Sequence, residues 1–420
     1  MNEMLVVDYL FIYSLICIWI LLLINIILSL AGYRCYIKTL SYKEININKG
    51  QYPRVSILVP AHNEEKVIGR TVISLLRLNY PKDSMEIIVI NDNSSDNSCE
   101  ILKEIENKYK EYNIKIINTD KNNGGKGKGN ALNIGLKNSS GDYIAVYDAD
   151  NTPERNALKY LIERIHRDES VGAVIGKFRT RNKNKNLLTR FINIETLSFQ
   201  WMAQAGRWQL FNLCTIPGTN FVVRRNLIDK LNGWDIKALA EDTEISFRIY
   251  KEGYKIAFMP LSVTWEQEPE NLKVWFKQRT RWAKGNVYVV IKYMEHIFRP
   301  VSRRVRFDIF YFFTVYFLFL SSVIISDGIF LLSIFSYVKI SVEGKFFLLW
   351  IMAYILFILE ISVTLTIEKG ESDIKNLMLI PIMYFTYCQL WIIVAINGII
   401  QYFKDKLLKK EGKWYKTERF

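Results

Sequence analysis

Short apolar runs alternate with amphipathic stretches between residues 55 and 147. Four runs have the length and β-branched content of buried strands: 55–60, 86–90, 114–117 and 143–147. The stretches between them have helical periodicity and cover residues 64–77, 98–109 and 130–138. Strands that are apolar throughout and separated by helices predict a parallel sheet covered on both faces. Ligands of such sheets bind beyond the carboxyl ends of the strands, so a site is expected there.

Longer apolar runs flank this region and have about the length of bilayer-spanning helices: 4–31, 307–338, 346–367 and 377–402. Tyr33, Arg34 and Lys38 follow the first run in place of a small-residue cleavage site, which predicts a retained anchor and not a removed signal peptide. Asp327-Gly328 in the middle of the second run predicts a break or a re-entrant turn there. The number of spans therefore stays open.

The net charge of +14 over 420 residues is concentrated beside these runs. By the positive-inside rule, the basic flanks of the polar stretch place it in the cytoplasm: Arg34, Lys38, Lys43, Arg299, Arg303, Arg304 and Arg306. The tail is also basic, although one amino-terminal and three carboxy-terminal spans would put it outside, so its side stays open. Because no nucleic-acid-binding motif accompanies the charge, we expect contact with membrane lipids and not with nucleic acid.

Two segments, 186–208 and 271–298, mix aromatic and apolar residues with polar and basic ones. We expect helices that lie in the headgroup plane, with ordinary amphipathic core helices as the alternative. The predicted organisation follows: an amino-terminal transmembrane helix (1–33), a cytoplasmic α/β domain (34–270), an interfacial helix (271–306), carboxy-terminal transmembrane helices (307–403) and a basic tail (404–420).

Candidate chemistry first appears where the fourth strand-like run ends, at Asp148 and Asp150. Such a pair is often a solvated turn, but at a strand end it can hold Mg²⁺ or Mn²⁺ on a diphosphate. The loop 123–133 is rich in glycine, carries Lys128 and enters a helix, so it is either a phosphate-binding loop or a flexible basic turn. The five cysteines and three histidines are scattered, so neither a disulfide framework nor a zinc site is expected.

Two further motifs follow downstream. Glu241-Asp242 opens an amphipathic stretch, where a carboxylate is either a helix cap or a base for an acceptor hydroxyl. Residues 278–282 read Gln-Arg-Thr-Arg-Trp. Arg281 can neutralise a departing diphosphate, and Trp282 offers a flat apolar face to a sugar ring or anchors the chain in the bilayer.

Together these motifs resemble the membrane-embedded family-2 glycosyltransferases, the group of cellulose, hyaluronan, chitin and poly-N-acetylglucosamine synthases. The resemblance covers about residues 50–300, and the spacing Gln278-x-x-Arg281-Trp282 is that of the processive members. It implies a GT-A-like, Rossmann-like α/β nucleotide-sugar-binding domain joined by interfacial helices to an α-helical transmembrane bundle.

The resemblance also implies a role for each matching residue. Glu64, Asp92, Lys128, Asp148, Gln278 and Arg281 would bind the UDP-sugar donor, Asp148 and Asp150 the metal, Trp282 and Glu241 the acceptor, and Asp242 would be the general base. Two motifs depart from the family pattern. Ala240 stands where threonine is usual, and residues 214–220 lack the Phe-Phe-Cys-Gly-Ser loop of cellulose synthases, which argues against cellulose.

The implied enzyme is an inverting, processive glycosyltransferase of the plasma membrane. It would polymerise UDP-glucose or UDP-N-acetylglucosamine into a β-linked exopolysaccharide and move the growing polysaccharide across the bilayer, with accessory exopolysaccharide subunits as partners. Three alternatives stay open: transfer of one sugar to a lipid carrier, an inactive nucleotide-sugar-binding scaffold, and a pure transporter. The spacing of Arg299 and Arg303 resembles a cyclic-dinucleotide motif, but the tail is too short for the accompanying barrel.

Overall fold

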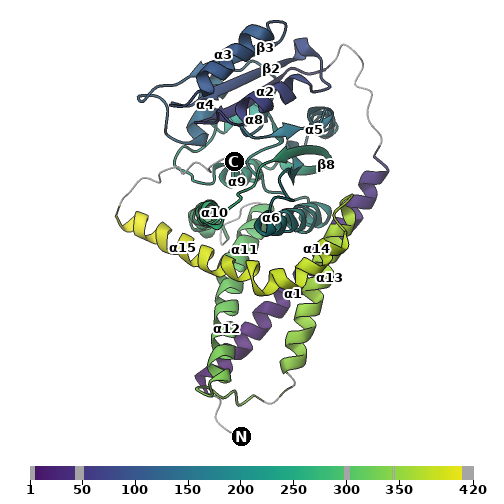
Figure 1. The fold of residues 1–420 in the computed structure, drawn as a ribbon, viewed down its shortest axis with the longest axis vertical. Helices are drawn as coiled ribbons and strands as arrows, with labels where there is room; N and C mark the ends of the chain where they lie inside the picture. The colour runs from purple at the N-terminus through teal and green to yellow at the C-terminus, as the bar shows by residue number, and fades with distance from the viewer. Residues whose placement is uncertain (1–4, 43–51, 298–302, 343, 345, 409–420) are drawn as a thin grey trace.

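The computed structural model describes residues 5–42, 52–297, 303–342, 344 and 346–408. A sheet domain lies at one end of the molecule and a group of long apolar helices at the other (Figure 1). Two helices lie between these parts, α6 (Leu187–Ser198) and α10 (Leu272–Tyr293). These are the two segments for which the sequence predicts interfacial helices.

The sheet has eight strands in the order β3-β2-β1-β4-β7-β6-β8-β5. Their bounds are β1 Val55–Ala61, β2 Met85–Asn91, β3 Asn113–Asn118, β4 Tyr143–Val146, β5 Thr152–Pro153, β6 Val171–Thr180, β7 Phe221–Arg224 and β8 Lys255–Glu266. The first four strands are parallel, as the sequence predicts. Strand β7 runs antiparallel to both β4 and β6, so the complete sheet is mixed.

Helices cover both faces of the sheet. Successive side chains of a strand point to opposite faces, and here both faces carry apolar side chains that must be buried. Leu58 of β1 belongs to a core shared with α4, whereas its neighbours Ile57 and Val59 belong to a second core shared with α2 and α5. The helices of the domain are α2 (Ile68–Leu76), α3 (Ser98–Lys108), α4 (Lys128–Lys137), α5 (Ala157–His166), α7 (Arg207–Phe211), α8 (Arg225–Lys230) and α9 (Glu241–Lys251). This double covering is what strands without polar faces require.

Of the described helices, three are long and apolar enough to cross a membrane, or four if a bent pair counts as one span. They are α1 (Val6–Leu40), the continuous helix Val305–Ile334 and α13 (Phe346–Ile367). The helix Val305–Ile334 comprises most of α11 (Arg303–Phe313), the π-helical segment Thr314–Phe319 and α12 (Leu320–Ile334). The bent pair is α14 (Ile374–Phe385) and α15 (Tyr387–Leu407), which meet at 45°. Helix α1 thus extends past residue 33, the predicted end of the first span.

The predicted break at Asp327-Gly328 is wrong. Both residues lie inside α12, and the chain bends instead at Thr386, between α14 and α15. Glycine costs a helix interior only about 1 kcal/mol, which the long apolar helix around it tolerates. Lys43, Arg299 and residues 409–420, which belong to the predicted basic flanks and tail, lie outside the described residues.

The helices between the two parts contact both of them. Helix α6 packs against β6 and against α13, and α10 packs along α15 and beside α9. Helix α1 meets the π-helical segment Phe199–Gly206 closely, since a Cβ on Gly32 would lie 1.9 Å from the Trp201 carbonyl oxygen. The apolar helices are therefore packed directly on the sheet domain. An orientation of α6 and α10 in the headgroup plane stays a prediction.

Candidate active site

The carboxyl ends of three neighbouring parallel strands carry the predicted donor-site residues. Glu64 follows β1, Asp92 follows β2, and Asp148 follows β4. The Glu64 N–H donates to the Ser98 hydroxyl at 2.9 Å, and the Glu64 side chain is buried. The edge of the sheet predicted from the sequence is therefore lined with carboxylates.

Asp92 ties the glycine-rich loop to this edge. Its Oδ1 accepts a hydrogen bond from the Gly125 N–H at 2.9 Å and another from the Thr119 hydroxyl at 2.8 Å. A Cβ on Gly124 would lie 2.5 Å from the same oxygen, so only glycine allows this approach. The loop leads directly into α4, whose first residue is Lys128.

Lys128 is the centre of a compact charged cluster. Its Nζ lies 2.5 Å from Asp148 Oδ1, donates to the Gly218 carbonyl oxygen at 2.7 Å and lies 4.0 Å from Glu241 Oε1. Asp242 is also close, because a Cβ placed on Gly218 would lie 2.7 Å from Asp242 Oδ2 and 3.3 Å from Lys128 Nζ. Residues far apart in the sequence thus meet at one place.

Gly218 belongs to the segment 214–220 and has φ +92°, a conformation that favours glycine. The next residue, Thr219, accepts a hydrogen bond from the Asp148 N–H at 3.0 Å. Neither residue is predicted from the sequence as part of the site. The Pro217-Gly218 pair signals a turn, but a turn signal does not say which side chains it lies beside.

Helix α10, which contains residues 278–282, lies beside the beginning of α9. A Cβ on Gly285 would lie 2.8 Å from the Ala240 Cβ, and the Thr243 hydroxyl lies 3.2 Å from Asn286 Oδ1. This close packing sets α10 against the beginning of α9, which holds Glu241 and Asp242. The Trp282 side chain is 39% exposed, whereas Gln278 is buried and its Oε1 accepts from Arg279 at 2.6 Å.

Residues 53–285 match the family model described as "Glycosyltransferase like family 2". This chain is a family-2 glycosyltransferase. It is 51% identical over 416 residues to the probable glycosyltransferase YdaM of Bacillus subtilis, with 98% of each chain covered. It is 34% identical over 250 residues to the poly-β-1,6-N-acetyl-D-glucosamine synthase of Staphylococcus aureus, an alignment that covers 60% of this chain and 58% of that protein.

The fold agrees with this assignment. The mannosyltransferase PcManGT from Pyrobaculum calidifontis, solved in complex with GDP-Man and Mn²⁺, superposes with a TM-score of 0.62. The superposition covers 92% of this chain and 99% of that one, at 18% sequence identity. The glycosyltransferase therefore has a GT-A-like mixed α/β domain, as predicted, together with three or four long apolar helices that indicate a membrane protein.

In this glycosyltransferase, burial and nearby charges together set the pKa values of the clustered side chains. Burial raises the pKa of Glu241 to about 7, and the neighbouring Asp242 carboxylate adds to the shift. Burial also raises the pKa of Asp242, although the charge of Lys128 opposes it. The pKa of Lys128 is raised as well, because Asp148 and Glu241 outweigh the opposing effect of burial. Arg281 lowers the pKa of both neighbouring carboxyls, so its positive charge also acts at this place.

The pair Asp148 and Asp150 supplies hard oxygen ligands. Asp150 is buried, and its Oδ2 accepts from the Gln267 N–H at 3.2 Å. Within the residues that the structure describes, no group of three or more histidine, cysteine, aspartate or glutamate side chains could hold a metal ion by itself. Two carboxylates fit an Mg²⁺ or Mn²⁺ ion that takes its other ligands from a diphosphate and water.

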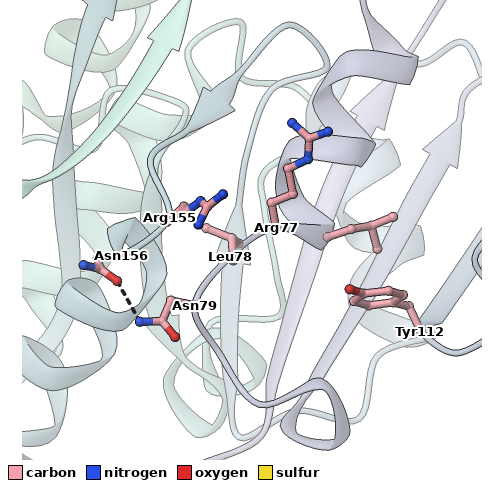
Figure 2. A pocket seen from close by; sticks show the side chains of 7 residues that line it. Arg77, Leu78, Asn79, Tyr112, Arg155 and Asn156 are labelled. Atoms are coloured by element: carbon pink, nitrogen blue, oxygen red, sulfur yellow. Dashed lines mark hydrogen bonds between the residues drawn. The ribbon is translucent and has the colours of Figure 1, made fainter.

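A hollow of about 690 Å³ lies apart from the cluster around Lys128 (Figure 2). Its lining residues are Leu76, Arg77, Leu78, Asn79, Tyr112, Arg155 and Asn156. Asn79 Nδ2 donates to Asn156 Oδ1 at 2.9 Å across its wall. The residues that precede β2 and β3 form part of this wall, so the hollow lies toward the amino ends of those strands. None of the predicted site residues lines it.

Proposed function

We propose that this glycosyltransferase is inverting and processive, and that it polymerises UDP-N-acetylglucosamine into a β-linked polysaccharide and moves the product across the plasma membrane. The convergence of Lys128, Asp148 and Asp242 beside α10 carries the proposal. The identity shared with the S. aureus synthase favours N-acetylglucosamine over glucose as the donor sugar. The domain would act from the cytoplasmic side, as the basic flanks of the sequence predict.

The arrangement of charges supports a single in-line displacement. Asp242 takes the proton of the acceptor hydroxyl while the oxygen of that hydroxyl bonds to the anomeric carbon of the donor. The bond from that carbon to the diphosphate breaks at the same time, and UDP leaves with the electron pair. Lys128 and Arg281 neutralise the charge that develops on the diphosphate. One displacement inverts the anomeric carbon, so no covalent intermediate with the protein is needed.

The remaining predicted residues have roles in holding the two substrates. Glu64 and Asp92 would contact the nucleoside of the donor, and Gln278 would lie on the side of the site that binds the donor diphosphate. Glu241 and Trp282 would contact the acceptor, with the exposed indole of Trp282 under the terminal sugar. Asp148 and Asp150 would hold Mg²⁺ or Mn²⁺, which supplies Lewis-acid neutralisation of the leaving diphosphate when bound.

A panel of UDP-sugars offered to the purified protein in lipid tests the function. We expect UDP-N-acetylglucosamine to give UDP release and a long product that a β-N-acetylglucosaminidase degrades. Product length is read on a gel and UDP release in a coupled assay. A single sugar attached to a lipid would refute processive synthesis, and absence of UDP release with every donor would favour a scaffold or transporter.

Removal of divalent ions is expected to stop turnover. Without the ion, the two carboxylates Asp148 and Asp150 would repel the diphosphate that they otherwise help to bind. UDP release should fall to background in a chelator and return when Mn²⁺ or Mg²⁺ is added in excess. Undiminished UDP release in the chelator would contradict the metal role of this aspartate pair.

A further inference from the structure

Arg279 has no role in the function described so far, yet it lies directly against Trp282, the residue proposed to contact the acceptor sugar. The guanidinium carbon of Arg279 lies 4.1 Å from the centre of the Trp282 ring. Arg279 is 1% exposed, whereas Trp282 is 39% exposed. Residues three apart in a helix lie on neighbouring positions of one side, so the contact follows from the helical register. One part of the indole is thus covered by a buried cation while another part stays accessible.

Arg279 is itself held by several polar groups. Its Nη2 lies 3.0 Å from Glu195 Oε2 and 3.8 Å from Glu268 Oε2, and its Nη1 donates to Gln278 Oε1 at 2.6 Å. Burial alone would lower the pKa of Arg279, but the Glu195 and Glu268 carboxylates raise it above the ordinary range. A planar guanidinium with partners on α6, on α10 and in the segment after β8 has little freedom to rotate, so its position over the Trp282 ring is fixed.

The same contacts reach the bend between α14 and α15. Glu195 Oε2 also accepts from the Tyr387 hydroxyl at 2.6 Å, and Trp275 Nε1 donates to that hydroxyl oxygen at 2.9 Å. Tyr387 is the first residue of α15, directly after the bend. The support of Trp282 therefore joins α6, α10 and the bent helix pair of the apolar region.

We propose that Arg279 is a positioning residue that, through its stack on Trp282, holds the indole in the orientation required by the acceptor sugar. This inference rests on the proposed function, because it assigns Trp282 to the acceptor. A sugar that stacks on an indole needs a defined ring plane, and the Trp282 side chain is 39% exposed. The Arg279 network, consisting of Arg279, Glu195, Glu268 and Gln278, supplies that plane.

Arg279→Lys is the decisive variant, because lysine keeps the positive charge of the network but lacks the planar group that stacks on the ring. We expect the KM for a soluble N-acetylglucosamine oligosaccharide acceptor to rise about tenfold, because the lysine ammonium keeps a cation near the ring but cannot fix the ring plane as the planar guanidinium does. The product should shorten, and the KM for UDP-N-acetylglucosamine should change much less than the acceptor KM, since Gln278 is the one member of the network assigned to the donor. Lys273→Met is the matched control, since Lys273 is an exposed cation near the beginning of the same helix.

A double-mutant cycle with Trp282→Ala separates positioning from a general structural effect. If Arg279 acts through the indole, Arg279→Lys should add nothing to the acceptor KM once Trp282 is alanine. A structural role would give additive losses, would raise the donor KM and would lower the melting temperature in both backgrounds. Additive effects of this kind would overturn the proposal.

A second measurement does not depend on activity. Hydroxyl-radical labelling of Trp282, read by peptide mass spectrometry, should increase in Arg279→Lys because the covered part of the ring becomes accessible. Unchanged labelling would overturn the proposed support whether or not a polymer is made. Increased labelling in a protein whose wild type makes no polymer would instead refute the proposed function and leave the support of Trp282 by Arg279 standing.

Discussion

Asp242→Asn is expected to lower the rate of sugar transfer by about 10²–10⁴-fold, the usual contribution of a positioned general base. Asparagine has nearly the shape of aspartate but cannot accept the proton of the acceptor hydroxyl. UDP binding should change little, because the contact between Lys128 and Asp148 at 2.5 Å does not involve Asp242. UDP release measures transfer, and calorimetric titration with UDP in the presence of Mn²⁺ measures binding.

Glu241→Gln is the matched comparison, since it removes the neighbouring carboxylate from the same turn of α9. Burial raises the pKa of both carboxyls, and the proposed roles differ: Glu241 contacts the acceptor, whereas Asp242 takes its proton. We therefore expect a smaller loss of transfer than in Asp242→Asn. A larger loss in Glu241→Gln would reverse the assignment of the two carboxylates. Loss of UDP binding in a folded Asp242→Asn protein would refute the base role.

Three strands in the first half of the sheet, β1, β2 and β4, could be predicted from the sequence because they are buried and apolar on both sides. Every residue of β1 from Val55 to Val59 is buried, and each predicted run overlaps a strand. A local pattern therefore contains the information on this region. The same reasoning located the carboxylates, because parallel strands place their carboxyl ends at one edge whatever the details of packing.

The second half of the sheet was not predicted, and β8 shows why. Pro260 lies in the middle of this strand, where proline normally argues against a strand. The pairing of β8 with β6 shifts register between the partners of Ile175 and Lys177, so Pro260 falls within the irregular part of the pairing. A bulge accommodates the missing N–H group. The need for such a bulge depends on the neighbouring strand and is not visible in the local sequence.

The details of the site likewise depend on contacts between distant segments. The sequence analysis named Lys128, Asp148 and Asp242 individually, but the segment that lies between Lys128 and Asp242 comes from residues 214–220. Its identity could not be read from a pattern, because no local periodicity reports which loop fills the space between two charged side chains. The same holds for Arg279, whose partners Glu195 and Glu268 lie on other elements.

Gly218→Ala is expected to reduce transfer by at least about 100-fold, because its new methyl group would occupy the space between the base and the lysine. The added Cβ would lie 2.7 Å from Asp242 Oδ2, closer than carbon and oxygen normally approach, and 3.3 Å from Lys128 Nζ, a tight contact. Relief requires a displacement of the Asp242 carboxylate, and misplacement of a reacting group by about 1 Å can cost about 100-fold in rate. UDP binding should weaken too, since the Gly218 carbonyl oxygen holds Lys128.

Gly253→Ala is the control that separates two effects of Gly218→Ala: the contact of the new methyl group with Asp242 and the strain of a positive φ at alanine. Gly253 has φ +84°, close to the +92° of Gly218, but among the described residues no atom beyond its chain neighbours lies within 4 Å of the position that its Cβ would take. Both substitutions place a side chain in a left-handed conformation, at a cost of about 1–2 kcal/mol each. The two variants should therefore lose similar thermal stability, whereas only Gly218→Ala should lose transfer. Equal activity of the two folded variants would show that the space beside Gly218 is not where the base and the lysine act, and the proposed geometry of the reaction would fail with it.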